Sequence, residues 1–120
     1  MTALIENALT KITVTGVDMK TAAATTLYTV PTGKVFYPVM VIIRDNSASL
    51  AGGTEYDFTG WRQNVDLSGM TAVGTTFRVL YATDNTSYTE NAAAGTFQIT
   101  VVTGSTAACT ATIDVIGYLA

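Results

Sequence analysis

The sequence contains no histidine and a single cysteine. Without histidine, neither a Ser-His-Asp nor a Cys-His nucleophilic site can form, and the commonest transition-metal ligand is missing. One cysteine excludes an intrachain disulfide, and Cys109 is expected to be a small buried hydrophobe, because a reactive thiol needs exposure and a nearby cation or base. These absences predict no catalytic residue, no metal site and no cofactor, and therefore a protein that is not an enzyme.

Charged residues are also few, at 12% of the chain, and the formal net charge is −3. The six lysine and arginine residues are scattered, so no basic surface is expected that could neutralise the phosphates of a nucleic acid. No apolar run approaches the roughly 18 to 20 residues that span a bilayer. The first residues have neither a basic start nor an apolar segment of signal-peptide type, which favours folding in the cytoplasm without a membrane partner.

Apolar residues are abundant, at 48% of the 120 residues, and the mean hydropathy is +0.34. This length and composition predict one folded domain with one core. We expect a single β-domain over residues 11–120, preceded by an N-terminal arm over residues 1–10. Because so few charges are available to solubilise the surface, part of it is expected to be covered by other subunits of a homo-oligomer.

Short runs of Thr, Val, Ile, Tyr and Phe, separated by Gly, Asn, Asp and Ser, are typical of strands and turns. Strands are expected over residues 11–17, 25–30, 35–44, 54–58, 76–82, 97–101 and 107–119, with one short strand between residues 60 and 74. The stretch 83–95 is expected to be a polar loop, with a short strand around Tyr88 as the alternative. About six to eight strands at roughly ten-residue spacing, without a convincing helix, predict an all-β sandwich or barrel, of which the two-sheet sandwich is favoured.

Alternation within these strands predicts which side chains point into the core. Tyr56 and Phe58 share the inward face of their strand, which leaves Glu55 and Asp57 outward. The inward side chains of the strand at residues 76–82 are expected to be Phe77, Val79 and Tyr81. The inward parity of the last strand holds Cys109, Ala111, Ile113, Val115 and Leu119, and the other parity holds Thr110, Thr112 and Asp114.

The segment at residues 35–43 differs from the other strands because both of its parities are apolar. Such a strand is covered twice, once by the core and once by something else. Pro38 has no backbone N–H to donate, which places this part of the strand at an edge, a bulge or a bend. An apolar edge would promote aggregation unless a partner covered it. The expected subunit interface consists of Phe36, Tyr37, Val39, Met40 and Ile42.

Aromatic residues and the N-terminal arm are the remaining candidates for contacts with a partner protein or a ligand. Trp61, flanked by Gly60 and Arg62, could stack on a sugar or anchor an interface, and filling the core is an equal alternative. Tyr88 lies in a polar stretch, where an exposed tyrosine suits a protein interface. Leu4 and Ile5 belong to the N-terminal arm, which could order on a partner or pair as an edge strand.

Acidic residues offer a further alternative. Glu55 and Asp57 are the only close carboxylate pair and could in principle act as a glycosidase pair, but a solvated strand face is the favoured interpretation. The loop pairs Asp45-Asn46 and Asp84-Asn85 could bind a hard cation through oxygen atoms. Turn formation is the favoured explanation of both pairs, because Asp and Asn bond their own backbone in turns.

Two segments resemble small β-sandwich structural proteins of tailed bacteriophages, of the capsid decoration, cement or head-fibre type. The first is TTLYTVPTGK at residues 25–34, which is followed by an apolar strand and is similar to the opening of such proteins. The second is VVTGSTAACTATIDVIGYL at residues 101–119, which is similar to their ending. Together the two segments bracket most of the chain.

The resemblance implies a jelly-roll-like, two-sheet antiparallel β-sandwich that binds the outside of a phage head. It further implies a homo-oligomer, with a trimer favoured, whose partner is the major capsid protein. Such a protein is part of the virion and assembles in the host cytoplasm. The alternative is a carbohydrate- or receptor-binding module of a phage tail or fibre, with Trp61, Tyr56 and Tyr88 as a stacking platform.

Overall fold

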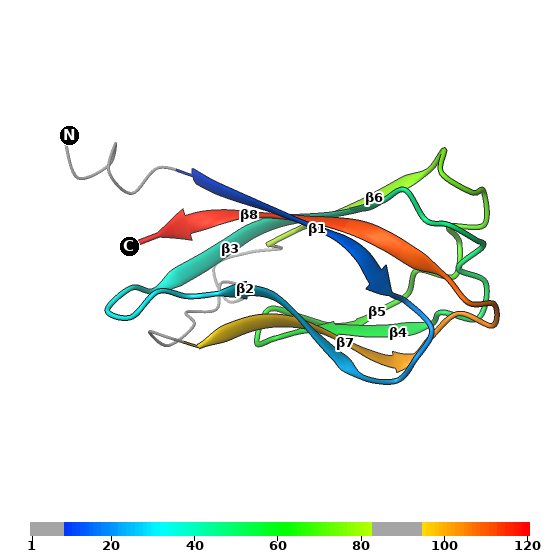
Figure 1. The fold of residues 1–120 in the computed structure, drawn as a ribbon, viewed down its shortest axis with the longest axis horizontal. Coiled ribbons are helices and arrows are strands. Elements are labelled where there is room, and N and C mark those ends of the chain that lie inside the picture. The colour runs from blue at the N-terminus through cyan, green and yellow to red at the C-terminus, as the bar shows by residue number, and fades with distance from the viewer. Residues whose placement is uncertain (1–8, 83–94) are drawn as a thin grey trace.

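The computed structural model describes residues 9–82 and 95–120, and this part of the chain forms eight strands and no helix that could cross a membrane (Figure 1). The strands are β1 (Leu9–Asp18), β2 (Ala24–Thr29), β3 (Phe36–Arg44), β4 (Glu55–Phe58), β5 (Arg62–Val65), β6 (Phe77–Tyr81), β7 (Thr96–Thr103) and β8 (Thr110–Leu119). They lie in two stacked layers. The prediction of an all-β fold is confirmed.

The strand order identifies the sandwich as a jelly roll. One layer, here called sheet A, has the order β1-β8-β3-β6, and the other, sheet B, has the order β2-β7-β4-β5. The antiparallel pairs are nested, because β1 pairs with β8, β2 with β7, β3 with β6 and β4 with β5. Folding such a nested ribbon over itself gives the double-sheet jelly roll. The two-sheet antiparallel sandwich is therefore confirmed.

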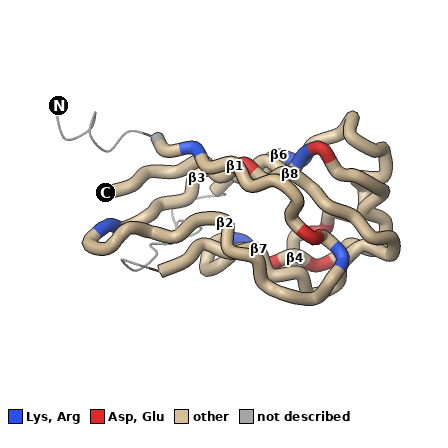
Figure 2. The backbone as a smooth tube through the Cα atoms, viewed as in Figure 1, with Lys and Arg blue, Asp and Glu red and all other residues tan. Residues whose placement is uncertain are grey.

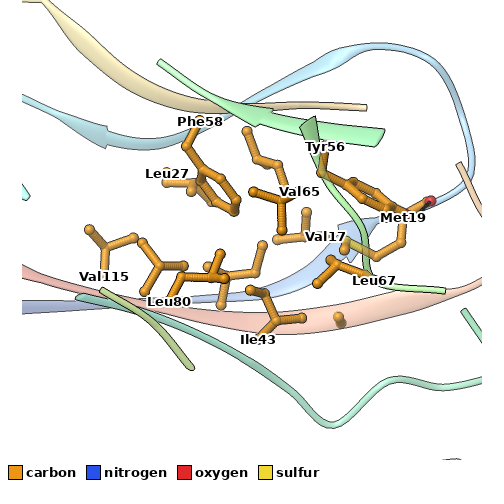
Figure 3. Packing of buried hydrophobic residues seen from close by; sticks show 14 of the residues in the cluster. Val17, Met19, Leu27, Ile43, Tyr56, Phe58, Val65, Leu67, Leu80 and Val115 are labelled. Atoms are coloured by element: carbon orange, nitrogen blue, oxygen red, sulfur yellow. Dashed lines mark hydrogen bonds between the residues drawn. The ribbon is translucent and has the colours of Figure 1, made fainter. Parts of the chain in front are cut away.

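The core lies between the two sheets, where side chains from both layers meet (Figure 3). Aromatic rings fill one part of it: Phe97 packs at 5.9 Å from Phe36, 6.1 Å from Trp61 and 6.2 Å from Phe58, measured between ring centroids. The inward parity predicted for the last strand is confirmed, because its residues are buried or pack partly buried against the core: Cys109, Ala111, Ile113, Val115 and Leu119.

β3 is an inner strand of sheet A, and the effect of Pro38 is a bulge. The register between β3 and β8 shifts between Pro38 and Met40. Pro38 lies opposite Gly117, where an added Cβ would come within 2.5 Å of the carbonyl oxygen of Tyr37 and 2.6 Å of the ring of Phe36. Glycine at this position allows the backbones to approach closely at the bulge. The predicted bulge is confirmed, and β3 is paired on one side only at Pro38, because its described pairing with β6 covers Met40–Arg44.

The predicted orientation of β6 is wrong. Phe77 and Tyr81 were expected to point inward, but they are 68% and 58% exposed, and Leu80 is buried instead. The register explains this, because Leu80 pairs with Val41, which faces the core. Arg78 shares the inward parity with Leu80, but its exposed guanidinium donates a hydrogen bond to the carbonyl of Asp66 at 3.2 Å. Because Arg78 is charged, the alternation of polar and apolar residues predicted the other parity, that of Phe77, Val79 and Tyr81, as the inward one.

Candidate functional site

The outer face of sheet A carries a continuous group of apolar side chains from β8, β3 and β6. Residues that lie directly opposite each other in an antiparallel ladder share one face. Met40 lies opposite Ile116 on one side and Tyr81 on the other, and Tyr37 lies opposite Tyr118. The group, called the apolar patch below, consists of Tyr37, Met40, Ile42, Phe77, Val79, Tyr81, Ile116 and Tyr118.

Exposure of the apolar patch is greatest at its rim. Phe77 and Tyr81 on β6 are the most exposed, Tyr118 on β8 is 42% exposed, and the other members are half-buried. The most exposed residues are therefore aromatic. Exposed apolar groups that form one contiguous patch mark interaction sites more often than isolated ones do. The patch is the main candidate functional surface of the described part of the chain.

The predicted interface residues of β3 divide between the two faces. Tyr37, Met40 and Ile42 lie on the apolar patch, as a strand covered on both sides requires. Val39 is half-buried at the bulge, and its carbonyl accepts the backbone N–H of Ala82 at 3.0 Å. Phe36 has no exposed surface and packs against Phe97 in the core. Its assignment to the interface is therefore corrected, because an enclosed ring cannot contact another subunit.

A polar cluster borders the apolar patch. The guanidinium of Arg44 donates from Nε to Oδ2 of Asp114 at 2.8 Å and from Nη2 to Oδ1 at 3.3 Å, and the hydroxyl of Thr13 donates to the same Oδ1 at 2.6 Å. A second ion pair joins Nη1 of Arg44 to Oδ2 of Asp45 at 2.7 Å. The side chain of Asp114 is only 4% exposed, so these donors replace the water that it loses.

The cluster keeps Asp114 ionised. The hydrogen bond from Arg44 lowers the pKa of the Asp114 carboxyl below its ordinary value, helped by the bond from Thr13 and opposed by burial. The same contact raises the pKa of Arg44. An ionised pair whose charges compensate each other needs no charged partner from another molecule. The apolar patch is therefore bordered by a satisfied ion pair rather than by a free charge.

The outer face of sheet B is polar. Gln98 donates from Nε2 to the hydroxyl of Thr26 at 3.2 Å across β7 and β2. Glu55 and Asp57 are half-buried on the outward parity of β4, as predicted, while Tyr56 and Phe58 between them are buried. Lys and Arg are spread along the backbone rather than gathered on one face (Figure 2). An apolar surface is thus a property of sheet A, not of both sheets.

The carboxylate of Asp57 has a structural partner. Its Oδ1 accepts the backbone N–H of Asn64 at 2.8 Å, and Asn64 has a positive φ of 57°. This bond holds the tight connection between β4 and β5. Asn46 of the loop pair Asp45-Asn46 behaves similarly, because its Nδ2 donates to the carbonyls of Ala48 and Ala72 at 2.8 and 3.1 Å, whereas the pair Asp84-Asn85 lies outside the described residues. Within residues 9–82 and 95–120, no group of three or more His, Cys, Asp or Glu side chains is arranged to hold a metal ion.

The residues proposed as a stacking platform do not form one on the described surface. Trp61 is 6% exposed and packs edge-on against Phe58, with ring centroids 6.0 Å apart. Tyr56 is fully buried, and its hydroxyl donates to the carbonyl of Met19 at 2.7 Å. Burial raises the pKa of Tyr56 to about 12. Trp61 and Tyr56 are thus core residues, which corrects their assignment to a ligand contact, and Tyr88, Leu4 and Ile5 lie outside the described residues.

Some members of the apolar patch were missed in the sequence. Ile116 and Tyr118 continue the parity of Thr112 and Asp114 in the last strand, so the sequence itself shows that this parity turns apolar toward the C-terminal end. That change is the available signal. Phe77 and Tyr81 lie on the face opposite to the one that the alternation of residues 76–82 predicts, because Leu80 pairs with the inward Val41.

Comparisons with known proteins show a likeness to a solved structure. Neither the protein-family models nor the curated proteins match the sequence. Among solved structures, the chain is similar to a chain of the capsid of Ralstonia phage GP4, with a TM-score of 0.52 and 16% sequence identity. The similarity covers 94% of this chain and 83% of that one. At this identity the likeness shows a shared fold alone. It does not show a shared function, because proteins of one fold serve many functions.

Proposed function

We propose that the protein is a virion structural protein of a tailed bacteriophage, which decorates the outside of the head and has no catalytic role. The observation that carries this proposal is the likeness of nearly the whole jelly roll to a chain of a phage capsid. The resemblance of residues 25–34 and 101–119 to phage structural proteins supports it independently. A double-sheet jelly roll is also a common architecture of viral capsid domains.

The proposed protein acts as a homo-oligomer on the capsid surface, with the major capsid protein as its partner. The subunit interface includes the outward residues Tyr37, Met40 and Ile42, with Val39 beside them at the bulge. Their apolar side chains are half-buried at the surface, and the neighbouring charges of Arg44 and Asp114 are paired with each other. An apolar region without unpaired charges is typical of the core of an interface. The resemblance favours a trimer. Assembly takes place in the host cytoplasm, and Leu4, Ile5 and Tyr88 remain proposed contacts with the capsid.

The carbohydrate- or receptor-binding alternative has lost its main support. It depended on Trp61 and Tyr56 as stacking residues, and both are enclosed in the core. The outer face of sheet B offers polar groups but no exposed aromatic ring among the described residues. Enzyme activity through Glu55 and Asp57 is not favoured either, because one carboxylate already holds the connection between β4 and β5.

The test uses the phage whose genome carries this gene. Purified heads assembled from the major capsid protein alone are mixed with the protein and separated on a density gradient. We expect the protein to travel with the heads in a fixed ratio, and phage lacking the gene to form heads that break at a lower temperature. A decorating protein strengthens a shell that assembles without it, which explains both results.

Other outcomes identify other roles. Failure of heads to assemble without the gene would make the protein a shell component rather than a decoration. Recovery of the protein on purified tails, or binding to a saccharide on a glycan array, would favour the tail or receptor-binding module. No association with any virion part would contradict the proposed function.

A further inference from the structure

The apolar patch extends well beyond the predicted interface strand. It begins at Tyr118 on β8, crosses β3 and ends at Phe77 on β6. Three strands of one sheet thus present a common apolar surface that no element of the described chain covers. A second sheet stacked on it at about 10 Å would cover it, as the two sheets of a sandwich cover each other.

The charges of this face favour an identical partner. The outer parity of the strands of sheet A holds Lys11 and Arg44 and the carboxylates Asp18 and Asp114, which cancel in formal charge, and Asp45 at the border also pairs with Arg44. Arg44 and Asp114 are paired with each other, and Asp18 accepts the backbone N–H groups of Lys20 and Thr21. A face with at most one excess charge, held in an ion pair, attracts neither a nucleic acid nor a strongly charged protein and repels a copy of itself only weakly.

The outer face of sheet B is a poor match for the apolar patch. Its described charges are Glu55 and Asp57, both acidic, and its outward residues on β7 are Thr96, Gln98, Thr100 and Val102. Packing the apolar patch on these groups would remove polar atoms from water without supplying partners. Of the two outer sheet faces formed by residues 9–82 and 95–120, only the patch itself offers a complementary surface.

The exposed area sets the expected strength of such a contact. Taking roughly 200 Å² for a whole aromatic side chain, the exposed fractions of Phe77, Tyr81 and Tyr118 amount to about 340 Å². The half-buried members of the patch add to this, whereas a stable interface buries about 800 Å² on each partner. The contact should therefore be weak in solution and strong only where copies are held close together, as on an assembled shell.

We infer that the apolar patch packs against the same patch of a second copy of this chain, in a two-fold sheet-to-sheet contact. This inference rests on the homo-oligomer of the proposed function and specifies its geometry. A contact between identical surfaces is closed by two-fold symmetry, so it makes pairs. It thus differs from the trimer that the resemblance implies, and a measurement of mass separates the two.

Sedimentation equilibrium of the full chain, from about 10 µM to about 1 mM, tests the inference. We expect the mass to rise from the monomer value of 12.6 kDa toward twice that value. The variant Phe77→Ser/Tyr81→Ser removes two exposed rings without touching the core, and it should weaken the association at least about tenfold. Tyr118→Ser, on another strand, should have a smaller effect in the same direction. The matched control is Val102→Ser, an exposed apolar residue on the opposite face, which should leave the association unchanged.

Each contrary result is distinct. A trimer mass would overturn the two-fold contact and leave the proposed function standing. Association that survives Phe77→Ser/Tyr81→Ser, or that is lost equally in Val102→Ser, would place the contact elsewhere. A wild-type protein that stays monomeric throughout the range would overturn the inference. So would a double variant that no longer binds heads but still associates with itself like the wild type, because the patch would then contact the capsid protein. Failure of the wild type to bind heads would contradict the proposed function alone.

Discussion

The two sheets of this protein share one core but present different outer faces. β7 alternates from Thr96 to Val101, with Phe97, Ile99 and Val101 buried and Thr96 and Gln98 half-buried on the outer side. β3 is apolar on both sides, with Val41 and Ile43 in the core and Met40 and Ile42 outside. The two sheets thus pack against the core in a similar way but differ in their outer surfaces, which are apolar on sheet A and polar on sheet B.

The difference shows what folding alone requires. Strand alternation with a polar outer parity is sufficient for a half-buried sheet, and sheet B has it. The second apolar parity of sheet A adds nothing to the core formed by the described residues, and we propose that it serves contacts with a second copy of the chain. The predictions below test whether the two faces differ in this way.

The largest expected effect concerns the bulge that sets which β3 residues face outward. Replacing Gly117 with Ala would place a methyl group against the Tyr37 carbonyl and the Phe36 ring, so we expect the free energy of unfolding to fall by about 3 kcal/mol. Urea unfolding followed by tryptophan fluorescence measures this change. Gly69→Ala is the control, because nothing lies within 4 Å of its added Cβ. Equal stability of the two variants would show that the bulge tolerates a side chain.

The next effect concerns the carboxylates of the two outer faces. Asp114→Asn removes the charged acceptor of Arg44 and Thr13 in a nearly enclosed position, and should lower the free energy of unfolding by about 2 kcal/mol. Asp57→Asn, the matched change on sheet B, disturbs one exposed bond to Asn64 and should cost well under about 1 kcal/mol. Thermal unfolding of both variants gives the comparison, and the reverse order of stability would contradict it.

A smaller effect is the dependence of the free energy of unfolding on pH in the acidic range. The native pKa of Asp114 is lowered by the bond from Arg44, so the folded state binds fewer protons than the unfolded state near the ordinary value of 3.8. The stability contributed by Asp114 is present above that value and is lost as the pH falls through the lowered native pKa. Urea midpoints measured from pH about 6 to about 2 should therefore fall less steeply in Asp114→Asn. The pKa values of Asp18 and Asp66 are also lowered, so part of the slope should remain.

The smallest expected effect is on the stability of variants of the apolar patch. Phe77→Ser and Tyr81→Ser remove side chains that lie mostly in solvent, so each should change the unfolding free energy of the monomer by less than about 0.5 kcal/mol. Unfolding at low protein concentration measures the monomer alone. A loss of several kcal/mol would mean that these rings support the subunit itself and would remove the contrast between the faces.

Sequence patterns were sufficient for the fold and for part of the candidate site. Regular short strands indicated a sandwich, and the double apolar parity of residues 35–43 identified Met40 and Ile42 as surface residues. Pairing could not be deduced, because the register that places Phe77 opposite Arg44 depends on contacts between distant segments. The orientation of Trp61 was equally beyond reach, since an aromatic ring next to a turn fits a core or a surface. The burial of Phe36 follows from the bulge at Pro38, whose position relative to Gly117 no local pattern reveals.

Nuclear magnetic resonance of the backbone amides, followed as protein concentration rises from about 10 µM to about 1 mM, tests most directly whether the outer face of sheet A is the assembly surface. The expected result is a set of concentration-dependent shifts confined to β3, β6 and the C-terminal half of β8, with the signals of β2 and β7 unchanged. Shifts confined to β2, β4 and β7, or spectra that stay constant over the whole range, would contradict the account.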